Sequence, residues 1–358
     1  MDNLKKDFNV WCKWDPLKKV VIGSCVHPEY FDHVANLEIK EKLQQITIET
    51  QEDLDNIADV CKKLGVEVVR ANRQNKHLPK YLDPSVKTKG TIAPLLLPRD
   101  QLVVIGNDLI SADRWTMLNN LFIDITDQLN KRDTPWYDLN VKHKIECFYP
   151  NSWTLVGKDL FIDVRQPNKN FDGLQEVLSA DIIEKWADKW FPQIDLHWCD
   201  IGGHNDGCFH TLKPGVIMSL EEIMTYEKTF PGWEVLYLPD QEWSKVPGFA
   251  EMKNKTQGRY WLPGDEKNDE LIDFINTWLD DWLGYVEETV FDVNCLMINE
   301  STVIVSSYNK TVFDFFKKHK IEPIICPLRH KYFFDGGIHC VSLDLYREGE
   351  CQSYIDYK

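Results

Sequence analysis

The feature that most constrains the fold is a repeated pattern of two short apolar strands joined by a tight polar turn. Each copy has apolar residues on both sides of a turn rich in Gly, Asn, Asp or Pro, which is typical of a β-hairpin. The copies span residues 101–111, 153–163, 208–219 and 295–306. This recurrence predicts a chain built from repeated units and not from two unrelated domains.

A helical pattern and a further strand follow several of these hairpins. Residues 51–64 read as an amphipathic helix that leads through Gly65 into an apolar strand at 66–69. The same sequence of a helix and then a strand recurs at 182–190 and 194–198, at 222–229 and 233–237, and at 311–318 and 321–325. The pattern predicts an α/β fold of about four or five strand–strand–helix–strand modules. We expect these modules to close into a ring around a channel that binds a small ligand.

No linker divides the chain, so residues 1–358 are expected to form a single catalytic domain. The stretch 245–270 is rich in Gly, Pro and charged residues and interrupts the repeat. We interpret it as an inserted loop or lid.

Charge and composition narrow the class of partner. The 358 residues carry a formal net charge of -16, which would repel a phosphate backbone and argues against a nucleic-acid partner. No apolar run is long enough for a membrane span, and the N-terminus lacks the apolar core of a signal peptide. We therefore expect a cytoplasmic protein that acts on small molecules, with no membrane partner.

The cysteines are spaced widely and form no C-x-x-C pair. There are 10 of them in a chain that needs no disulfide staples, so most are expected to be reduced core residues. No Cys or His pair has the spacing of a structural zinc site backed by a second pair. We expect neither a metal nor a cofactor.

One candidate for chemistry lies near the C-terminus. Gly336 and Gly337 precede His339 and Cys340, and an alternating strand follows at 341–345. Glycines allow a ligand to approach the backbone closely, so Cys340, expected to begin the strand, is the candidate nucleophile. Because neighbouring strand side chains point to opposite faces, His339 is expected to be a packed or solvent-facing histidine and not the partner base.

A second candidate lies at His204 and Asp206, ahead of the third hairpin. In an extended chain these side chains share one face and offer a proton-transfer group and a carboxylate to one pocket. A turn with an Asp cap explains the same pattern. The catalytic interpretation depends on Cys340, since thiolate catalysis uses a cysteine and a histidine from separate parts of the chain.

Five segments together resemble the glycine amidinotransferases, in the same order along the chain. They are Trp14–Gly23, Pro98–Asp100, His204–Asp206, Asn294–Ile298 and Gly336–Asp344. The resemblance covers nearly the whole chain and implies the five-module, pseudo-symmetric propeller of the guanidino-group-modifying superfamily.

The resemblance also implies a mechanism. The Cys340 thiolate would attack the central carbon of a guanidinium group, while Asp206 and Asp100 accept its paired N–H bonds. His204 would protonate the leaving amine and then deprotonate the acceptor amine. The expected activity is amidino transfer from a guanidino donor, arginine, to an amine acceptor. Guanidine hydrolysis with the same residues and a catalytically silent binding protein are the alternatives.

The chain departs from the family where an acid should orient His204. The family has Phe-Asp-x-x-Asp before the second hairpin, whereas Cys147–Ser152 contains neither acid. Glu146 after a shift of register, or the hydroxyl of Tyr149, are the candidate replacements.

A second departure concerns specificity. The family's carboxylate-binding arginine aligns near Ile223, and its paired serines align near Glu287 and Glu288. Such a pocket disfavours a carboxylate, so we expect a substrate pair other than arginine and glycine, with a basic amine as acceptor. Glu288, Tyr149 and Arg329 complete the expected substrate-binding set, and a homodimer is left open.

Overall fold

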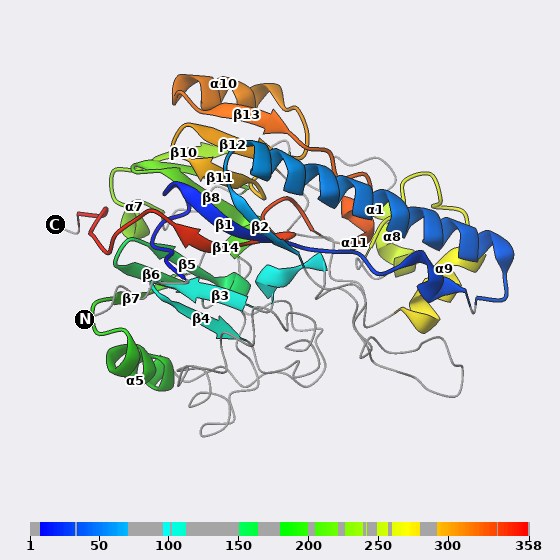
Figure 1. The fold of residues 1–358 in the computed structure, drawn as a ribbon, viewed down its shortest axis with the longest axis horizontal. Helices are drawn as coiled ribbons and strands as arrows, with labels where there is room; N and C mark the ends of the chain where they lie inside the picture. Colours follow the sequence, from blue (N-terminus) through cyan, green and yellow to red (C-terminus); the bar gives the residue numbers. More distant parts are fainter. Residues whose placement is uncertain are drawn as a thin grey trace.

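The computed structural model describes residues 8–32, 34–70, 96–100, 102–111, 150–163, 180–199, 205–220, 226–238, 241, 249–256, 260–279, 292–334 and 336–356. Within these ranges the chain has an α/β fold whose strands form five small sheets (Figure 1). No helix in the same ranges is long and apolar enough to cross a bilayer.

One sheet joins the two ends of the described chain. Its strand order is β14 (Ser342–Arg347), β1 (Leu17–Ile22) and β2 (Glu67–Arg70). β1 is antiparallel to β14 and parallel to β2, and α1 (Leu37–Lys63) makes the crossover between the parallel strands. The C-terminal strand therefore supplies the first strand of a strand–strand–helix–strand unit that the N-terminal segment completes.

Three further sheets repeat this order, each with an antiparallel hairpin followed by a strand parallel to the second. Their elements are β5 (Trp153–Val156), β6 (Asp159–Asp163), α5 (Ala180–Trp190) and β7 (Asp195–Cys199); β8 (Phe209–Lys213), β9 (Val216–Ser219), α7 (Tyr226–Thr229) and β10 (Glu234–Tyr237); and β11 (Leu296–Asn299), β12 (Thr302–Val305), α10 (Lys310–Lys318) and β13 (Glu322–Ile325). The fifth sheet contains β3 (Leu102–Ile105) and β4 (Asp108–Ser111). All four hairpins predicted from the sequence are confirmed.

The turn between β5 and β6 shows why a glycine stands there. Gly157 has a φ of 65°, and a Cβ at this position would lie 2.0 Å from the carbonyl oxygen of Gln352. The N–H of Gly157 donates to the oxygen of Trp11, and the N–H of Lys158 donates to that of Gln352. The N-terminal and C-terminal segments thus both pack on this hairpin.

Helix α1 is longer than the sequence pattern predicts. It begins at Leu37, where the side chain of Asn36 accepts hydrogen bonds from the N–H groups of Glu38 and Ile39. The prediction began at residue 51 because the β-branched residues at 46–50 obscure the helical pattern. A short helix, η1 (Pro28–Phe31), precedes it.

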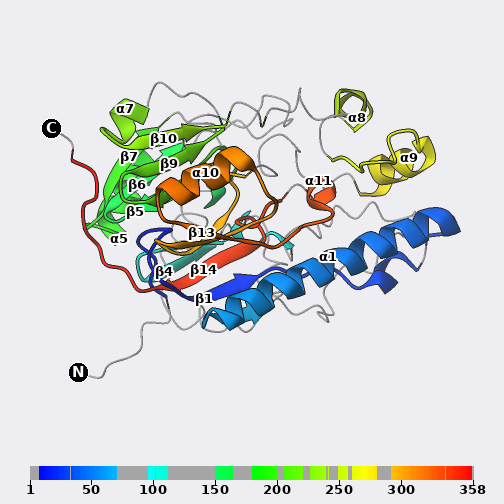
Figure 2. The ribbon, with the colours of Figure 1, turned by 90° about the horizontal axis from the view of Figure 1, so that it is seen from above.

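A group of short helices lies beside the N-terminal half of α1, away from the sheets (Figures 1 and 2). They are α8 (Phe249–Thr256), α9 (Asp269–Trp278) and α11 (Lys331–Phe334). Lys42 of α1 pairs with Asp265 at 2.7 Å, which fixes the segment before α9 against α1. Residues 245–270 contain α8, and the interpretation of this stretch as an inserted loop or lid stays a prediction.

A buried ion cluster ties β14 to three other segments. Asp344 accepts hydrogen bonds from Arg347 Nε at 2.8 Å and from Arg99 Nη2 at 3.1 Å. Arg347 also donates to the carbonyl oxygens of Asp15, at 2.6 Å, and Met297, at 2.7 Å. Burial alone would raise the pKa of Asp344, but the guanidinium of Arg347, followed by that of Arg99, outweighs it and holds the pKa well below its usual range.

Asp344→Asn should lower the free energy of unfolding by about 3–5 kcal/mol at pH 7, since two buried guanidinium groups lose their counter-charge. The folded-state pKa of Asp344 is depressed, so its contribution is complete above the pKa of an unfolded Asp, about 4, and is lost as the pH falls below that value. The free energy of unfolding, measured in urea between pH 7 and pH 3, should therefore change less with pH for the variant than for the wild type. Asp314→Asn removes an exposed partner of Lys310 and serves as the control. Equal losses of unfolding free energy in Asp344→Asn and Asp314→Asn would contradict the stabilising role given to Asp344.

Candidate active site

Cys340 lies in a turn and not in a strand. Residues 338–341 form the turn, closed by hydrogen bonds from Val341 N to the oxygen of Gly337 and from Ser342 N to that of His339, both 3.1 Å. The prediction that Cys340 begins a strand is therefore wrong by two residues, because β14 starts at Ser342. We call residues Gly336–Val341 the cysteine turn. Cys340 is 1% exposed within it.

Asn294, which precedes β11, makes several contacts with the cysteine turn. Its Oδ1 accepts the N–H groups of His339 at 2.8 Å and Cys340 at 3.1 Å, and its backbone oxygen accepts that of Ile338 at 3.1 Å. Its Nδ2 donates to Cys340 Sγ at 2.9 Å. One buried side chain thus binds both the backbone and the sulfur of the turn.

Arg99 binds backbone carbonyl groups on both sides of Cys340, whereas Asn294 binds backbone N–H groups. Its Nε donates to the carbonyl oxygens of His339 at 3.1 Å and Ser342 at 3.0 Å, on either side of Cys340. Because Nη2 of Arg99 also binds Asp344, the guanidinium connects the turn to the buried ion cluster. The backbone around Cys340 is therefore fixed through its N–H groups by Asn294 and through its carbonyl groups by Arg99.

His339 is a packed histidine, one of the two states expected for it. It is buried, and its ring meets that of His210 edge to face with 5.0 Å between the ring centroids. The packing supports the interpretation that His339 is a core residue and not the proton-transfer partner of its neighbour.

The segment that follows His204 is helical and not extended. Asn205–Cys208 form the short helix α6, so the expectation of an extended His-x-Asp triplet is wrong from Asn205 onward. Asn205 is buried, and its Nδ2 donates to the oxygen of Ser152 at 2.8 Å and to Thr154 Oγ1 at 3.2 Å. This amide holds α6 against the beginning of β5.

The backbone segments that carry two predicted substrate ligands are linked by contacts to β14, the strand that follows the cysteine turn. Helix η2 (Pro98–Asp100) contacts β14 and also η5 (Pro150–Ser152), which in turn contacts α6. Asp100 and Asp206 lie in η2 and α6, whose backbones are described, although their side chains are not. His204, Tyr149 and Glu288 lie outside the described residues, so their predicted roles stay predictions.

Several other cysteines are unsuited to nucleophilic attack. Burial is the main cause that raises the pKa of Cys61 and of Cys295 to about 12, and that of Cys326 to about 11. Thiols with such pKa values are almost wholly protonated near neutral pH. These residues match the expectation of reduced core cysteines.

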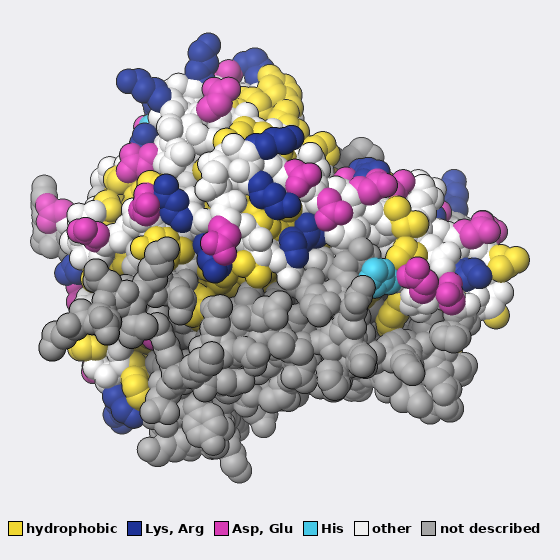
Figure 3. All heavy atoms as spheres, in the orientation of Figure 1, with side chains coloured by type: hydrophobic (Ala, Val, Ile, Leu, Met, Phe, Trp, Pro, Cys, Tyr) yellow, Lys and Arg dark blue, Asp and Glu magenta, His cyan; other side chains and the backbone are white. Residues whose placement is uncertain are grey.

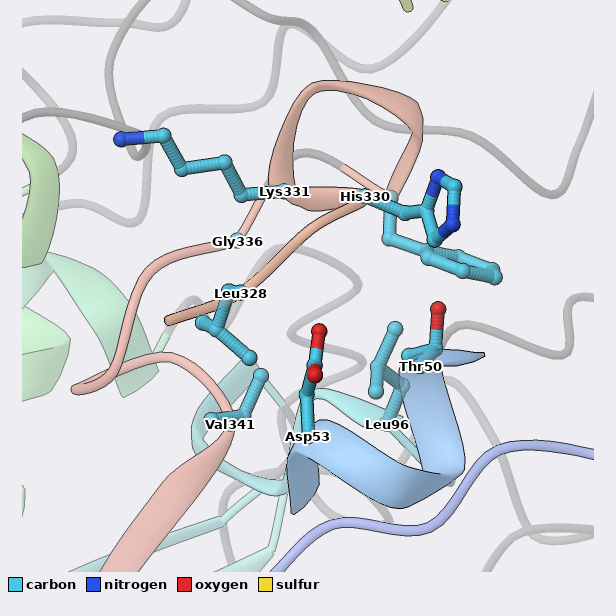
Figure 4. A pocket seen from close by; sticks show the side chains of 9 residues that line it. Thr50, Asp53, Leu96, Leu328, His330, Lys331, Gly336 and Val341 are labelled. Atoms are coloured by element: carbon cyan, nitrogen blue, oxygen red, sulfur yellow. The ribbon is translucent and has the colours of Figure 1, made fainter. Parts of the chain in front are cut away.

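A small pocket lies between α1 and the cysteine turn (Figure 4). Its lining residues are Thr50, Asp53, Leu96, Leu328, His330, Lys331, Phe334, Gly336 and Val341. Gly336 and Val341 are the two ends of the cysteine turn, so the pocket borders the turn although Cys340 is not in its lining. The Lys331 amine points away from the pocket in Figure 4, and burial lowers its pKa.

Arg329 is bound to α1. Its Nε donates to Asp53 Oδ1 at 2.9 Å and its Nη2 to Glu52 Oε2 at 2.8 Å, while its backbone N–H donates to Asp53 Oδ2 at 2.7 Å. The hydrogen bond to Asp53 raises the pKa of Arg329 further above its usual value. In this arrangement Arg329 ties the segment before α11 to α1, and its predicted contact with a substrate stays a prediction.

Comparison with known proteins gives consistent matches over nearly the whole chain, although no protein-family model matches it. Mitochondrial glycine amidinotransferase of Gallus gallus is 23% identical over 407 residues, which cover 96% of this chain and 84% of that protein. L-arginine:L-lysine amidinotransferase of Pseudomonas savastanoi pv. phaseolicola is 20% identical over 389 residues, 96% of each chain. The solved structure of SxtG, an amidinotransferase from Microseira wollei, aligns with a TM-score of 0.63 and 17% identity over 98% of this chain and 100% of that one.

The chain is a homologue of the amidinotransferases and an enzyme of that class. Two residues at the site of this amidinotransferase homologue are not among those predicted from the sequence. Arg99 stands inside the Pro98–Asp100 motif, in which Asp100 is the predicted ligand. Asn294 begins a segment that resembles the family, and its side chain could have been noticed as the polar residue that opens an otherwise apolar strand.

Gly337→Ala should destabilise the fold more than Gly336→Ala. A Cβ on Gly337 would lie 2.5 Å from Asn294 Cγ and Oδ1, whereas a Cβ on Gly336 would meet only the tip of Leu97 at 2.6 Å. Overpacking of this kind costs about 1–3 kcal/mol when the neighbour is fixed, and less when it is a flexible side chain. Urea unfolding of both variants measures the difference. A larger loss for Gly336→Ala would show that Asn294 is not tightly held.

Proposed function

We propose that this chain transfers an amidino group from a guanidino donor to an amine acceptor through a covalent intermediate on Cys340. The observation that carries the proposal is the run of contacts that leads from β14, the strand after the cysteine turn, to η2, η5 and α6. These elements carry, or directly follow, the residues expected to bind and protonate a guanidinium group.

The proposed reaction has two half-reactions. The Cys340 thiolate forms a C–S bond with the guanidinium carbon, and the C–N bond to the donor breaks as His204 gives a proton to the leaving amine. The acceptor amine then loses a proton to His204 and attacks the same carbon, and the thiolate leaves. Asp100 and Asp206 accept N–H bonds from the planar cation in both steps.

The proposed donor is arginine, which the name of the Pseudomonas savastanoi relative includes. We further propose that the acceptor is a basic amine. This follows from the acidic Glu287 and Glu288 and the apolar Ile223 at positions where the family has carboxylate-binding residues. An acceptor with a carboxylate at that end would meet like charge.

We also propose that the five sheets are the modules of a propeller in one catalytic domain. The shared order of strands and helices supports it, as does the sheet in which β14 and β1 pair, since pairing the chain ends closes a ring of modules. A cytosolic location and action as a homodimer stay predictions; the Gallus gallus relative is named mitochondrial.

Wild-type protein incubated with arginine and no acceptor should gain the mass of an amidino group on Cys340, because the second half-reaction cannot proceed. Cys340→Ala should keep its fold and show no adduct and no turnover. Peptide mass spectrometry locates the adduct, and ornithine without citrulline distinguishes transfer from hydrolysis. Cys351→Ala, which removes an exposed thiol, is the control. An adduct on another cysteine would refute the assignment of the nucleophile.

A panel of guanidines and amines tests the specificity. A basic amine should give a higher kcat/KM than glycine with arginine as donor, and Glu288→Ser should narrow that difference, because it removes one of the two negative charges of Glu287 and Glu288. The specificity proposal fails if arginine with glycine gives the highest kcat/KM and Glu288→Ser changes nothing.

A further inference from the structure

We propose that Asn294 is a positioning residue for Cys340. The side-chain amide of Asn294 holds the Cys340 sulfur in the geometry for attack on the guanidino carbon. The inference rests on the proposed transfer through Cys340 and adds a residue to that machinery. The contact that carries it is the 2.9 Å hydrogen bond from Asn294 Nδ2 to Cys340 Sγ.

The orientation of the amide follows from its other contacts. Oδ1 of Asn294 accepts the N–H groups of His339 and Cys340, and only an oxygen can accept them. The NH₂ group must then face the sulfur, where it can only donate. A thiolate accepts such a bond more strongly than a thiol does, so the contact favours the reactive form.

The position of Asn294 is fixed by the structure around it. The residue is 2% exposed, and its backbone oxygen accepts the N–H of Ile338. Gly337 has no side chain at the point where a Cβ would collide with Asn294, so the side chain of Asn294 packs directly against the backbone of Gly337. Asn294 therefore holds three consecutive N–H groups of the cysteine turn as well as the sulfur.

A purely structural role for Asn294 makes a different prediction. Asn294→Asp keeps an oxygen that accepts the two backbone N–H groups but replaces the amide donor with a carboxylate oxygen beside the sulfur. Because that carboxylate itself opposes ionisation of Cys340, Gly337→Ala, which displaces Asn294 without a change of charge, decides between the two roles. If Asn294 only supports the backbone, Cys340 keeps its reactivity in Gly337→Ala. If it positions and stabilises the thiolate, the thiol becomes harder to ionise while the fold is retained.

The test measures alkylation of Cys340 by iodoacetamide as a function of pH, with labelling at Cys340 followed by peptide mass spectrometry. The pH at which the rate of Cys340 alkylation is half its maximum should rise by about one unit or more in Asn294→Asp. The kcat with arginine should fall about tenfold or more, while its KM changes by less than about threefold. Asn268→Asp is the matched control, since Asn268 caps α9 through its Oδ1 and an Asp caps a helix equally well.

Circular dichroism and urea unfolding establish that the variants fold. Gly337→Ala, which displaces Asn294 without a change of charge, should raise the pH of half-maximal alkylation in the same direction, whether or not Asn294→Asp folds. The inference is overturned if a folded variant alkylates with the wild-type pH profile. If this happens while the wild type still forms the amidino adduct, only the role of Asn294 is refuted. A wild type that forms no adduct refutes the proposed function instead.

Discussion

The carboxylate of Asp344 lies between two guanidinium groups, and the position of the cysteine turn depends on this cluster. Arg347 directs its other N–H groups to the carbonyl oxygens of Asp15 and Met297, while Arg99 directs its Nε to the carbonyls on either side of Cys340. Each member is almost fully buried. The loss of one would leave the others without the bonds that offset their burial.

The cysteine turn is consequently held by hydrogen bonds from within the protein. Its N–H groups are bound by Asn294, and the carbonyl groups that flank Cys340 are bound by Arg99. Catalysis gains when reacting groups need no reorganisation, because the entropy of alignment has been lost during folding. The glycine pair that marked the turn in the sequence serves this arrangement, since Gly337 admits the side chain of Asn294.

The sequence predicts those parts of the structure that have local causes. Alternating strands and polar turns identify the four hairpins found in the described residues, and the glycine pair with the family resemblance selects Cys340. Contacts between distant residues leave no local pattern: Asn294 meets a sulfur 46 positions away, and Arg99 meets a carbonyl 240 positions away. The helical turn at Asn205 was missed for the same reason, because its amide is fixed by β5 and not by its neighbours.

The buried cluster also explains why charged side chains stand where apolar ones would be easier to bury. Aliphatic side chains of equal volume often stabilise a core as well as a buried ion pair does, but they do not fix direction. Met297 lies three residues beyond Asn294 on β11, and Arg347 lies on the strand that follows Cys340. Arg347 therefore ties the strand that follows Asn294 to the strand that follows the cysteine turn. A misplacement of about 1 Å can lower a rate about a hundredfold, and such a shift between these strands would first have to break the bonds of Arg347.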